Sequence, residues 1–180
     1  MSSSAKKITS LTVLKSKIRS LKARGRKIVF TNGTFDLLHV GHVTYLEKAK
    51  TFGDILVIGV NTDRSVKSYK TPDRPYNCEQ DRLRVLAALA CVDFVTLFDQ
   101  PTPIKLILEL EPDILVKGAD WKISQIAGAK EVVSWGGQVK LVRLVPGRST
   151  TNILERIKDN LSFPRKRESR APSGSPPPRG

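Results

Sequence analysis

The chain has 180 residues, of which 39% are hydrophobic and 27% charged, and its formal net charge is +14. This length suits one domain with one core, and the composition is typical of globular proteins. The longest strongly apolar run, residues 55–60, is too short to cross a membrane, and the charges within residues 11–21 lead us to expect no signal segment there. Cys78 and Cys91 indicate neither a disulfide framework nor a zinc site, so we expect a cytoplasmic protein without membrane contact.

The basic excess lies at the two ends of the chain. Residues 1–27 hold nine Lys and Arg and no acid, and residues 161–180 hold five basic residues and one Glu. Residues 28–160 are nearly neutral, with 17 basic and 16 acidic residues. A nucleic-acid-binding domain usually carries its basic stripe on a folded face. We therefore expect no specific nucleic-acid partner, and binding through the basic ends is a remote alternative.

In chain order, residues 1–8 are small, polar and basic, and we predict that they are disordered. A helix is predicted from Ser10, because apolar residues at helical spacing precede a glycine: Leu11, Leu14, Ile18, Leu21 and Gly25. Short apolar runs and helical segments then alternate. The predicted strands are residues 27–31, 55–60, 94–98, 113–116 and 139–142. The predicted helices are residues 41–51, 79–91, 103–110, 123–135 and 151–159.

This alternation predicts βαβ units, and therefore a doubly wound, five-stranded parallel sheet with helices on both faces. We assign residues 9–160 to one α/β domain built on this sheet. Residues 161–180 contain five of the 11 prolines, with Ser, Gly and Arg between them and little to bury. We predict that they form a disordered, basic, Pro-rich tail.

Distinctive polar residues follow the first predicted strand. Gly33 permits a tight turn, Thr34 offers a hydroxyl, and His39 and His42 are three residues apart where a helix begins. Gly41 between them lets another group approach the backbone. Since a helix N-terminus attracts anions, the pattern predicts a phosphate site with two imidazoles beside it. The alternatives are capping or surface roles for the histidines, or a zinc site, for which no third ligand stands at a convincing spacing.

The string GTFDLLHVGH at residues 33–42 resembles the signature of the cytidylyltransferase-like nucleotidyltransferases, Rossmann-like α/β enzymes with an HxGH motif. GRSTT at residues 147–151 resembles the late motif of this family, which opens the last helix. VNTDRSVKSYK, VKGADW, IAGAKEV and STTNI add a closer resemblance to the heptose 1-phosphate adenylyltransferases within the family. The resemblance covers roughly residues 11–158.

The resemblance implies that ATP and D-glycero-D-manno-heptose 1-phosphate, a sugar 1-phosphate, react to give ADP-heptose and pyrophosphate, for the lipopolysaccharide core. In many bacteria this activity is the C-terminal half of a bifunctional protein with a sugar kinase, and we expect the stand-alone form here. The alternatives are a cytidylyltransferase of another phosphorylated polyol, such as glycerol 3-phosphate, and an inactive nucleotide binder. Leu144 stands where some cytidylyltransferases carry an arginine, for which Arg143 or Arg148 could substitute, so base choice stays open. Pairing into a homodimer is also left open.

The resemblance further implies in-line attack on the α-phosphorus without a protein nucleophile. It gives catalytic roles to His39, His42 and Lys67, with Lys70 as an alternative to Lys67. It gives nucleotide-binding roles to Thr34, Phe35, Gly41, Arg82, Lys117, Gly118, Asp120, Ser149, Thr150 and Thr151. It gives substrate-binding roles to Asp36, Asn61, Asp63 and Trp121. Structural alternatives are helix capping for Asp36, surface pairing with Glu79 for Arg82, and packing for Trp121. The triphosphate implies Mg²⁺ held mainly by phosphates and water, so we expect no protein metal ligands.

Overall fold

The computed structural model describes residues 3–71 and 73–162, and it confirms the predicted five-stranded parallel sheet. The spatial order is β3-β2-β1-β4-β5. The strands are β1 (Ile28–Gly33), β2 (Ile55–Asn61), β3 (Phe94–Phe98), β4 (Ile114–Gly118) and β5 (Gln138–Val142). The chain winds outward from β1 to β3 and then restarts on the other side of β1 with β4. Ligands of such sheets bind at the carboxyl ends of the strands beside this reversal.

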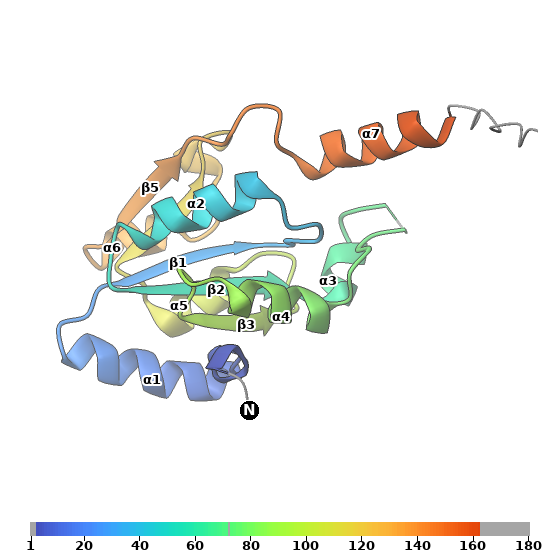
Figure 1. Cartoon of the computed structure of the whole chain (residues 1–180). Helices are drawn as coiled ribbons and strands as arrows, with labels where there is room; N and C mark the ends of the chain where they lie inside the picture. The colour runs from blue at the N-terminus through green and yellow to red at the C-terminus, as the bar shows by residue number, and fades with distance from the viewer. Residues whose placement is uncertain (1–2, 72, 163–180) are drawn as a thin grey trace, which may run out of the picture.

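Helices cover both faces of the sheet (Figure 1). In the described ranges they are α1 (Leu11–Ala23), α2 (Val40–Lys50), α3 (Asp63–Lys67), α4 (Glu79–Ala88), α5 (Ile104–Leu110), α6 (Ala129–Ser134) and α7 (Thr150–Ser162), with the 3-10 helices η1 (Ser3–Lys7) and η2 (Ile123–Gln125). Side chains of α2 and α4 pack in one core, and those of α1, α5 and α6 pack in another.

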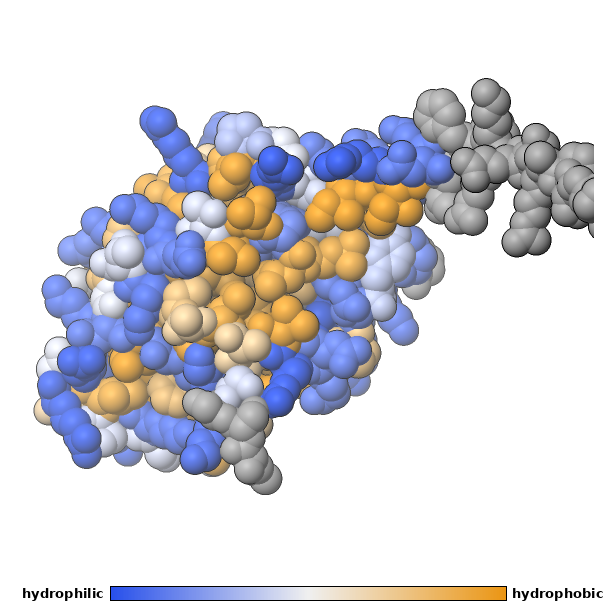
Figure 2. All heavy atoms as spheres, in the orientation of Figure 1, coloured by the Kyte–Doolittle hydropathy of each residue, from blue (hydrophilic) through white to orange (hydrophobic). Residues whose placement is uncertain are grey.

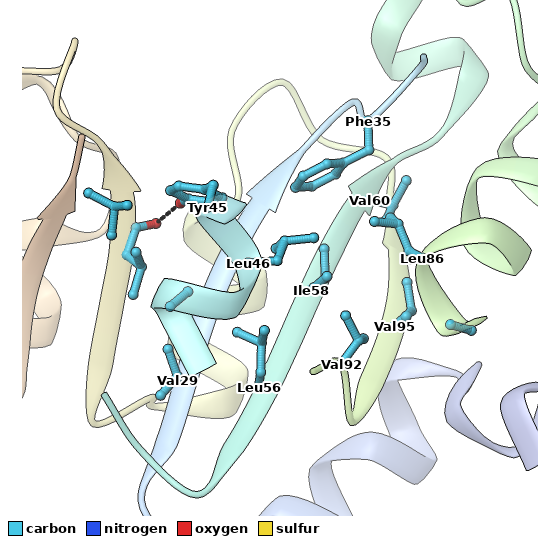
Figure 3. Close-up of a cluster of buried hydrophobic side chains, with 14 of the residues drawn as sticks. Val29, Phe35, Tyr45, Leu46, Leu56, Ile58, Val60, Leu86, Val92 and Val95 are labelled. Atoms are coloured by element: carbon cyan, nitrogen blue, oxygen red, sulfur yellow. Dashed lines mark hydrogen bonds between the residues drawn. The ribbon is translucent and has the colours of Figure 1, made fainter. Parts of the chain in front are cut away.

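The apolar strand runs supply both cores, because successive side chains of a strand point to opposite faces. In the first core, Leu56 and Ile58 of β2 pack with Val29 of β1, Leu46 of α2 and Leu86 of α4 (Figure 3). The second core contains Ile28, Phe30, Leu14, Ile107 and Leu115. Burial on both faces fixes the register of β1 against its neighbours, and this holds the residues after its end in place.

The N-terminal segment differs from the prediction. Residues 1–8 are predicted to be disordered, but η1 forms within them and Ile8 makes a parallel bridge to Val95 at the outer edge of β3. The Lys7 ammonium donates a 2.8 Å hydrogen bond to the carbonyl oxygen of Leu89. The segment is ordered by these contacts with distant residues, which its polar, basic composition does not reveal.

Two connections also differ from the predicted elements. The predicted helix over residues 123–135 is divided into η2 and α6 by Gly128, whose φ is 87°. A Cβ at Gly128 would collide with Cδ1 of Ile107, so this close approach requires glycine. Helix α3 lies in a stretch for which the sequence predicts no element, and Thr62 caps it by accepting a hydrogen bond from the backbone N–H of Ser65.

The C-terminal helix α7 extends away from the sheet (Figure 1). Residues 161–180 are predicted to be a disordered tail, but α7 continues to Ser162. The rest of that predicted tail, residues 163–180, lies outside the described residues. In the part of the chain that is described, no helix combines the length and the apolar character needed to cross a bilayer.

Candidate active site

A cleft of about 700 Å³ opens at the carboxyl ends of the central strands, between the starts of α2 and α7. Twelve of the predicted site residues line it: Thr34, Phe35, His39, Gly41, His42, Asn61, Lys117, Gly118, Asp120, Trp121, Ser149 and Thr150. These residues come from four separate stretches of the sequence, and the fold brings them together at the place expected from the strand order.

His39 and His42 stack on each other at the N-terminus of α2. His39 is the N-cap, and its carbonyl accepts hydrogen bonds from the backbone N–H groups of His42 and Val43 at 2.9 and 3.2 Å. The ring centroids of the two histidines are 3.9 Å apart and their planes differ by 26°. The Nδ1 atom of each ring is buried without a hydrogen-bond partner. Orphaned polar atoms in a cleft indicate a place for a ligand.

Both imidazoles are neutral at pH 7. Burial lowers the pKa of His39. Burial, together with His39 and then Lys70, lowers the pKa of His42 to about 4, while a backbone hydrogen bond to Leu37 acts in the opposite direction. A neutral imidazole has one N–H donor, and a bound phosphate would favour the protonated form. The pair can therefore donate to phosphate oxygens and gain positive charge when an anion arrives.

The turn after β1 presents Thr34 to the cleft. Phe35 follows in the left-handed region, with φ 49°, and its ring lies 5.3 Å from that of His42, centroid to centroid. The hydroxyl groups of Thr34 and Tyr69 form a 2.7 Å hydrogen bond. Tyr69, which sequence reasoning missed, also lines the cleft. A phosphate contact with Thr34 would replace or share this hydrogen bond.

Gly41 allows the chain before α7 to approach α2. A Cβ at Gly41 would lie only 2.8 Å from the carbonyl oxygen of Arg148. The next residue, Ser149, accepts a 3.1 Å hydrogen bond from the backbone N–H of Asn152 through its Oγ, as an N-cap does. Two helix N-termini thus border one cleft, and both favour anions there.

Lys117 reaches from the end of β4 to the end of β1. Its ammonium donates to Asn32 Oδ1 at 2.6 Å and to the Asn32 carbonyl at 3.3 Å, and it lies 5.9 Å from the ring centroid of Trp121. Burial lowers the pKa of Lys117 to about 8, and the nearby Asp120 partly opposes this shift. The Asp120 carboxylate folds over Gly118, where a Cβ would collide with it.

Arg82, to which the family resemblance gives a nucleotide-binding role, lies outside the lining of the cleft. It is 1% exposed. Its guanidinium donates to the carbonyl oxygens of Thr34 at 2.6 Å, Asn61 at 2.7 Å and Asn77 at 3.1 Å, and to Asp63 Oδ1 at 2.8 Å. The side chain therefore joins the turn after β1 to the end of β2, behind the cleft. Neither Arg82 nor its partner Asp63 lines the cleft.

Asp36 is likewise turned away from the cleft. One carboxylate oxygen accepts hydrogen bonds from the backbone N–H groups of Tyr76 and Asn77 at 2.8 and 2.9 Å. The other lies 2.9 Å from Arg74 Nε in a buried ion pair. Asp36 thus fastens the segment before α4 to the motif; it does not cap α2, whose N-cap is His39, and it does not line the cleft in which a substrate contact is predicted.

Two more predicted residues do not line the cleft. Lys67 is exposed at the end of α3, and Thr151 is exposed on α7. The cleft also includes residues to which the sequence analysis gave no site role, among them Asn32, Thr102 and Gln125. Asn32 lies near the carboxyl end of β1 and Thr102 lies shortly after β3, so the strand-end rule could have identified them.

Comparison with known proteins agrees with this geometry. The family model described as cytidylyltransferase-like matches residues 30–160. The chain belongs to the cytidylyltransferase-like family. The resemblance carried by residues 33–42 and 147–151 is thereby confirmed, and it extends over most of the described chain.

The relatives agree with this membership. The chain is 54% identical over 153 residues to the "Bifunctional protein HldE" of Methylobacillus flagellatus and 58% identical over 151 residues to that of Magnetococcus marinus. These matches cover 85% and 84% of this chain but 31% of each relative, so the chain spans about a third of their length. The solved lipopolysaccharide core biosynthesis protein of Thermoplasma volcanium is 31% identical, with a TM-score of 0.55. That match covers 67% of this chain and 98% of the other.

Proposed function

We propose that this protein transfers the adenylyl group of ATP to D-glycero-D-manno-heptose 1-phosphate, giving ADP-heptose and pyrophosphate for the lipopolysaccharide core. The stacked His39–His42 pair carries the proposal, because both residues line the cleft and each has a buried Nδ1 atom without a hydrogen-bond partner among the described residues, in a chain of the cytidylyltransferase-like family. The choice of heptose rests on the motif strings, on relatives named as bifunctional HldE proteins, and on the lipopolysaccharide core biosynthesis protein. The resemblance implies an activity that in many bacteria is one half of a bifunctional protein, so a match between this chain and only part of the HldE relatives agrees with it.

In this reaction an oxygen of the acceptor phosphate forms a bond to the α-phosphorus of ATP. The bond from that phosphorus to the bridging oxygen breaks, and pyrophosphate leaves from the opposite side. The second pKa of a phosphate monoester is about 6, so the acceptor is already ionised at pH 7 and needs no general base. His39, His42 and Thr34 would donate hydrogen bonds to the phosphate oxygens as charge develops. Ser149 and Thr150 would hold the triphosphate at the start of α7.

A magnesium ion fits this cleft only as a companion of the nucleotide. Asp120 is the one carboxylate that lines the cleft among the described residues. In the same part of the chain, no three metal-binding side chains of His, Cys, Asp or Glu are grouped. Phosphate oxygens and water would then supply most ligands, as they commonly do for Mg²⁺. When bound, the ion would neutralise part of the negative charge of the nucleotide phosphates.

Two nucleotides, ATP and CTP, are candidates for the donor of the nucleotidyl group. Leu144 and Arg148 both line the cleft, whereas Arg143 does not. Arg148 is therefore the arginine that could take the place of the one that some cytidylyltransferases carry near Leu144. This placement keeps transfer from CTP, to glycerol 3-phosphate for example, as the alternative to transfer from ATP.

The test is pyrophosphate release by the purified protein. ATP and CTP are each combined with heptose 1-phosphate, glucose 1-phosphate and glycerol 3-phosphate. We expect release with ATP and heptose 1-phosphate, and a loss of about 100-fold or more in the His39→Ala and His42→Ala variants, with their melting curves as the control for folding. Turnover with CTP alone would replace adenylyl by cytidylyl transfer. Folded protein that releases no pyrophosphate with any pair would refute the proposal.

A further inference from the structure

The proposed reaction needs two places for phosphate groups. In-line transfer puts the attacking phosphate and the leaving pyrophosphate on opposite sides of the α-phosphorus. Each side carries negative charge, and bringing the two together in a partly buried cleft requires a positive group or N–H donors on both sides. Each positive group that lines the cleft can therefore be assigned either to the polyphosphate of the nucleotide or to the phosphate of the acceptor.

One side is already provided with donors. The N-terminus of α2, with His39 and His42, lies against the chain before α7, because Gly41 is almost in contact with the carbonyl oxygen of Arg148. Ser149 and Thr150 follow directly and also line the cleft. These groups form one continuous wall. It suits the polyphosphate of the nucleotide, because it combines two helix N-termini with several N–H and O–H donors.

Lys117 is the positive group that remains. Among the described residues, Lys117 and Arg148 are the only lysine and arginine that line the cleft, and Arg148 comes from the segment before α7, whose backbone lies against Gly41. Lys117 comes from β4 and is held by Asn32 of β1, which places it on the floor between two adjacent strands. No carboxylate in residues 3–71 and 73–162 forms a direct ion pair with it, and Asp120 acts on its charge only from a greater distance.

A partly buried ammonium without a carboxylate partner is costly unless an anion completes it. Lysine has three N–H donors, and Asn32 accepts two of them, through its side-chain and backbone oxygens. One donor remains for a ligand in the cleft. The ammonium lies 5.9 Å from the centroid of the Trp121 ring, within reach of a cation–π contact.

We propose that Lys117, oriented by Asn32, binds the phosphate group of the acceptor and so selects phosphorylated acceptors. This rests on the proposed function, and it refines the role implied by the resemblance, which places Lys117 on the nucleotide. The acceptor phosphate and a nucleotide phosphate have the same chemistry, so the experiment must separate binding of the two substrates.

The first experiment compares wild type with Lys117→Met and with the matched control Lys122→Met, an exposed lysine outside the cleft. We expect Lys117→Met to raise the KM for heptose 1-phosphate by about 10- to 100-fold, the loss of one charge-assisted hydrogen bond. The dissociation constant of α,β-methylene-ATP should change by less than about threefold. Lys122→Met should match wild type. Weakened nucleotide binding with an unchanged acceptor KM would overturn the inference.

A second measurement separates this inference from the proposed function. Inorganic phosphate is titrated calorimetrically into protein saturated with α,β-methylene-ATP. Binding that is present in wild type and lost in Lys117→Met supports the inference, even if wild type turns over no sugar phosphate and the proposed function fails. If wild type turns over heptose 1-phosphate but Lys117→Met binds inorganic phosphate as well as wild type does, the inference about Lys117 is refuted. The proposed function is then retained.

Lys117→Arg guards against a folding defect in the methionine variant, because it keeps the charge and can still reach Asn32. Burial lowers the pKa of Lys117 to about 8, so the kcat/KM of wild type for the acceptor should fall above that pH. The arginine variant should keep its kcat/KM up to pH 9.5. The other titratable or charged groups that line the cleft are His39, His42, Tyr45, Tyr69, Asp120 and Arg148. They are common to both proteins, and equal profiles in the two would overturn the inference.

Discussion

Arg82→Met tests whether this arginine supports the fold or binds phosphate. The guanidinium makes four hydrogen bonds behind the cleft, three to carbonyl oxygens and one to Asp63, and the residue is 1% exposed. Methionine fills a similar volume but leaves these acceptors without a donor. Each buried acceptor left alone costs about 1–3 kcal/mol, and breaking a buried ion pair costs about 3–5 kcal/mol in total. Because Asp63 is partly exposed and can be hydrated, these costs do not add in full. We expect Arg82→Met to lower the free energy of unfolding by about 3–5 kcal/mol.

For a domain of this size the loss corresponds to a fall in melting temperature of roughly 10–15 °C. The assay is thermal unfolding followed by circular dichroism, with α,β-methylene-ATP binding measured on the folded variant. Arg64→Met is the matched control, because Arg64 also pairs with a carboxylate, that of Asp99, but its side chain is 84% exposed. The control should lose less than about 1 kcal/mol. If Arg82→Met instead melts near the wild-type temperature and loses nucleotide binding, Arg82 binds the nucleotide and does not support the fold.

Three further predictions concern the walls of the cleft. Gly41→Ala should weaken ATP binding by about 10-fold, measured by calorimetry, because the new methyl group displaces the carbonyl of Arg148, 2.8 Å away, and with it the start of α7. Tyr45→Phe should lower the free energy of unfolding in urea by about 1–2 kcal/mol, because the hydroxyl is buried and donates to the Val116 carbonyl at 3.0 Å. His42 should make stability depend on pH. Burial and the neighbouring His39 lower its pKa to about 4 in the folded protein from its ordinary value of 6.5, so its contribution to stability is complete above pH 6.5 and is lost as the pH falls toward 4. His42→Asn should therefore show a smaller fall in melting temperature over this range than wild type.

The sequence predicts the sheet well, because each strand is a short apolar run between helical segments. Four residues that line the cleft were also accessible from the sequence, because they belong to compact motifs at strand or helix ends: His39, His42, Ser149 and Thr150. Arg82 shows why the rest is harder. Its spacing from Glu79 suggests a surface pair, but Glu79 instead accepts the backbone N–H of Asp63 at 2.7 Å.

Contacts between distant parts of the chain account for the other differences. Lys117 meets an oxygen of Asn32, 85 positions earlier in the chain, because β4 pairs with β1. Gly128 interrupts a helix because Ile107 needs the space. Neither partner can be read from the local pattern of the sequence, which records periodicity but not which neighbours a strand acquires.

The bridge between Ile8 and Val95 bears on how the protein avoids self-association. β3 is an outer strand, and an uncovered outer strand offers its free N–H and C=O groups to any other extended chain. The backbone N–H of Thr9 donates to the Val95 carbonyl at 3.0 Å, so the chain's own N-terminal segment occupies part of that edge. Removing the residues before Ser10 would open the edge to intermolecular strand pairing, and the shortened protein would be the more prone to aggregate.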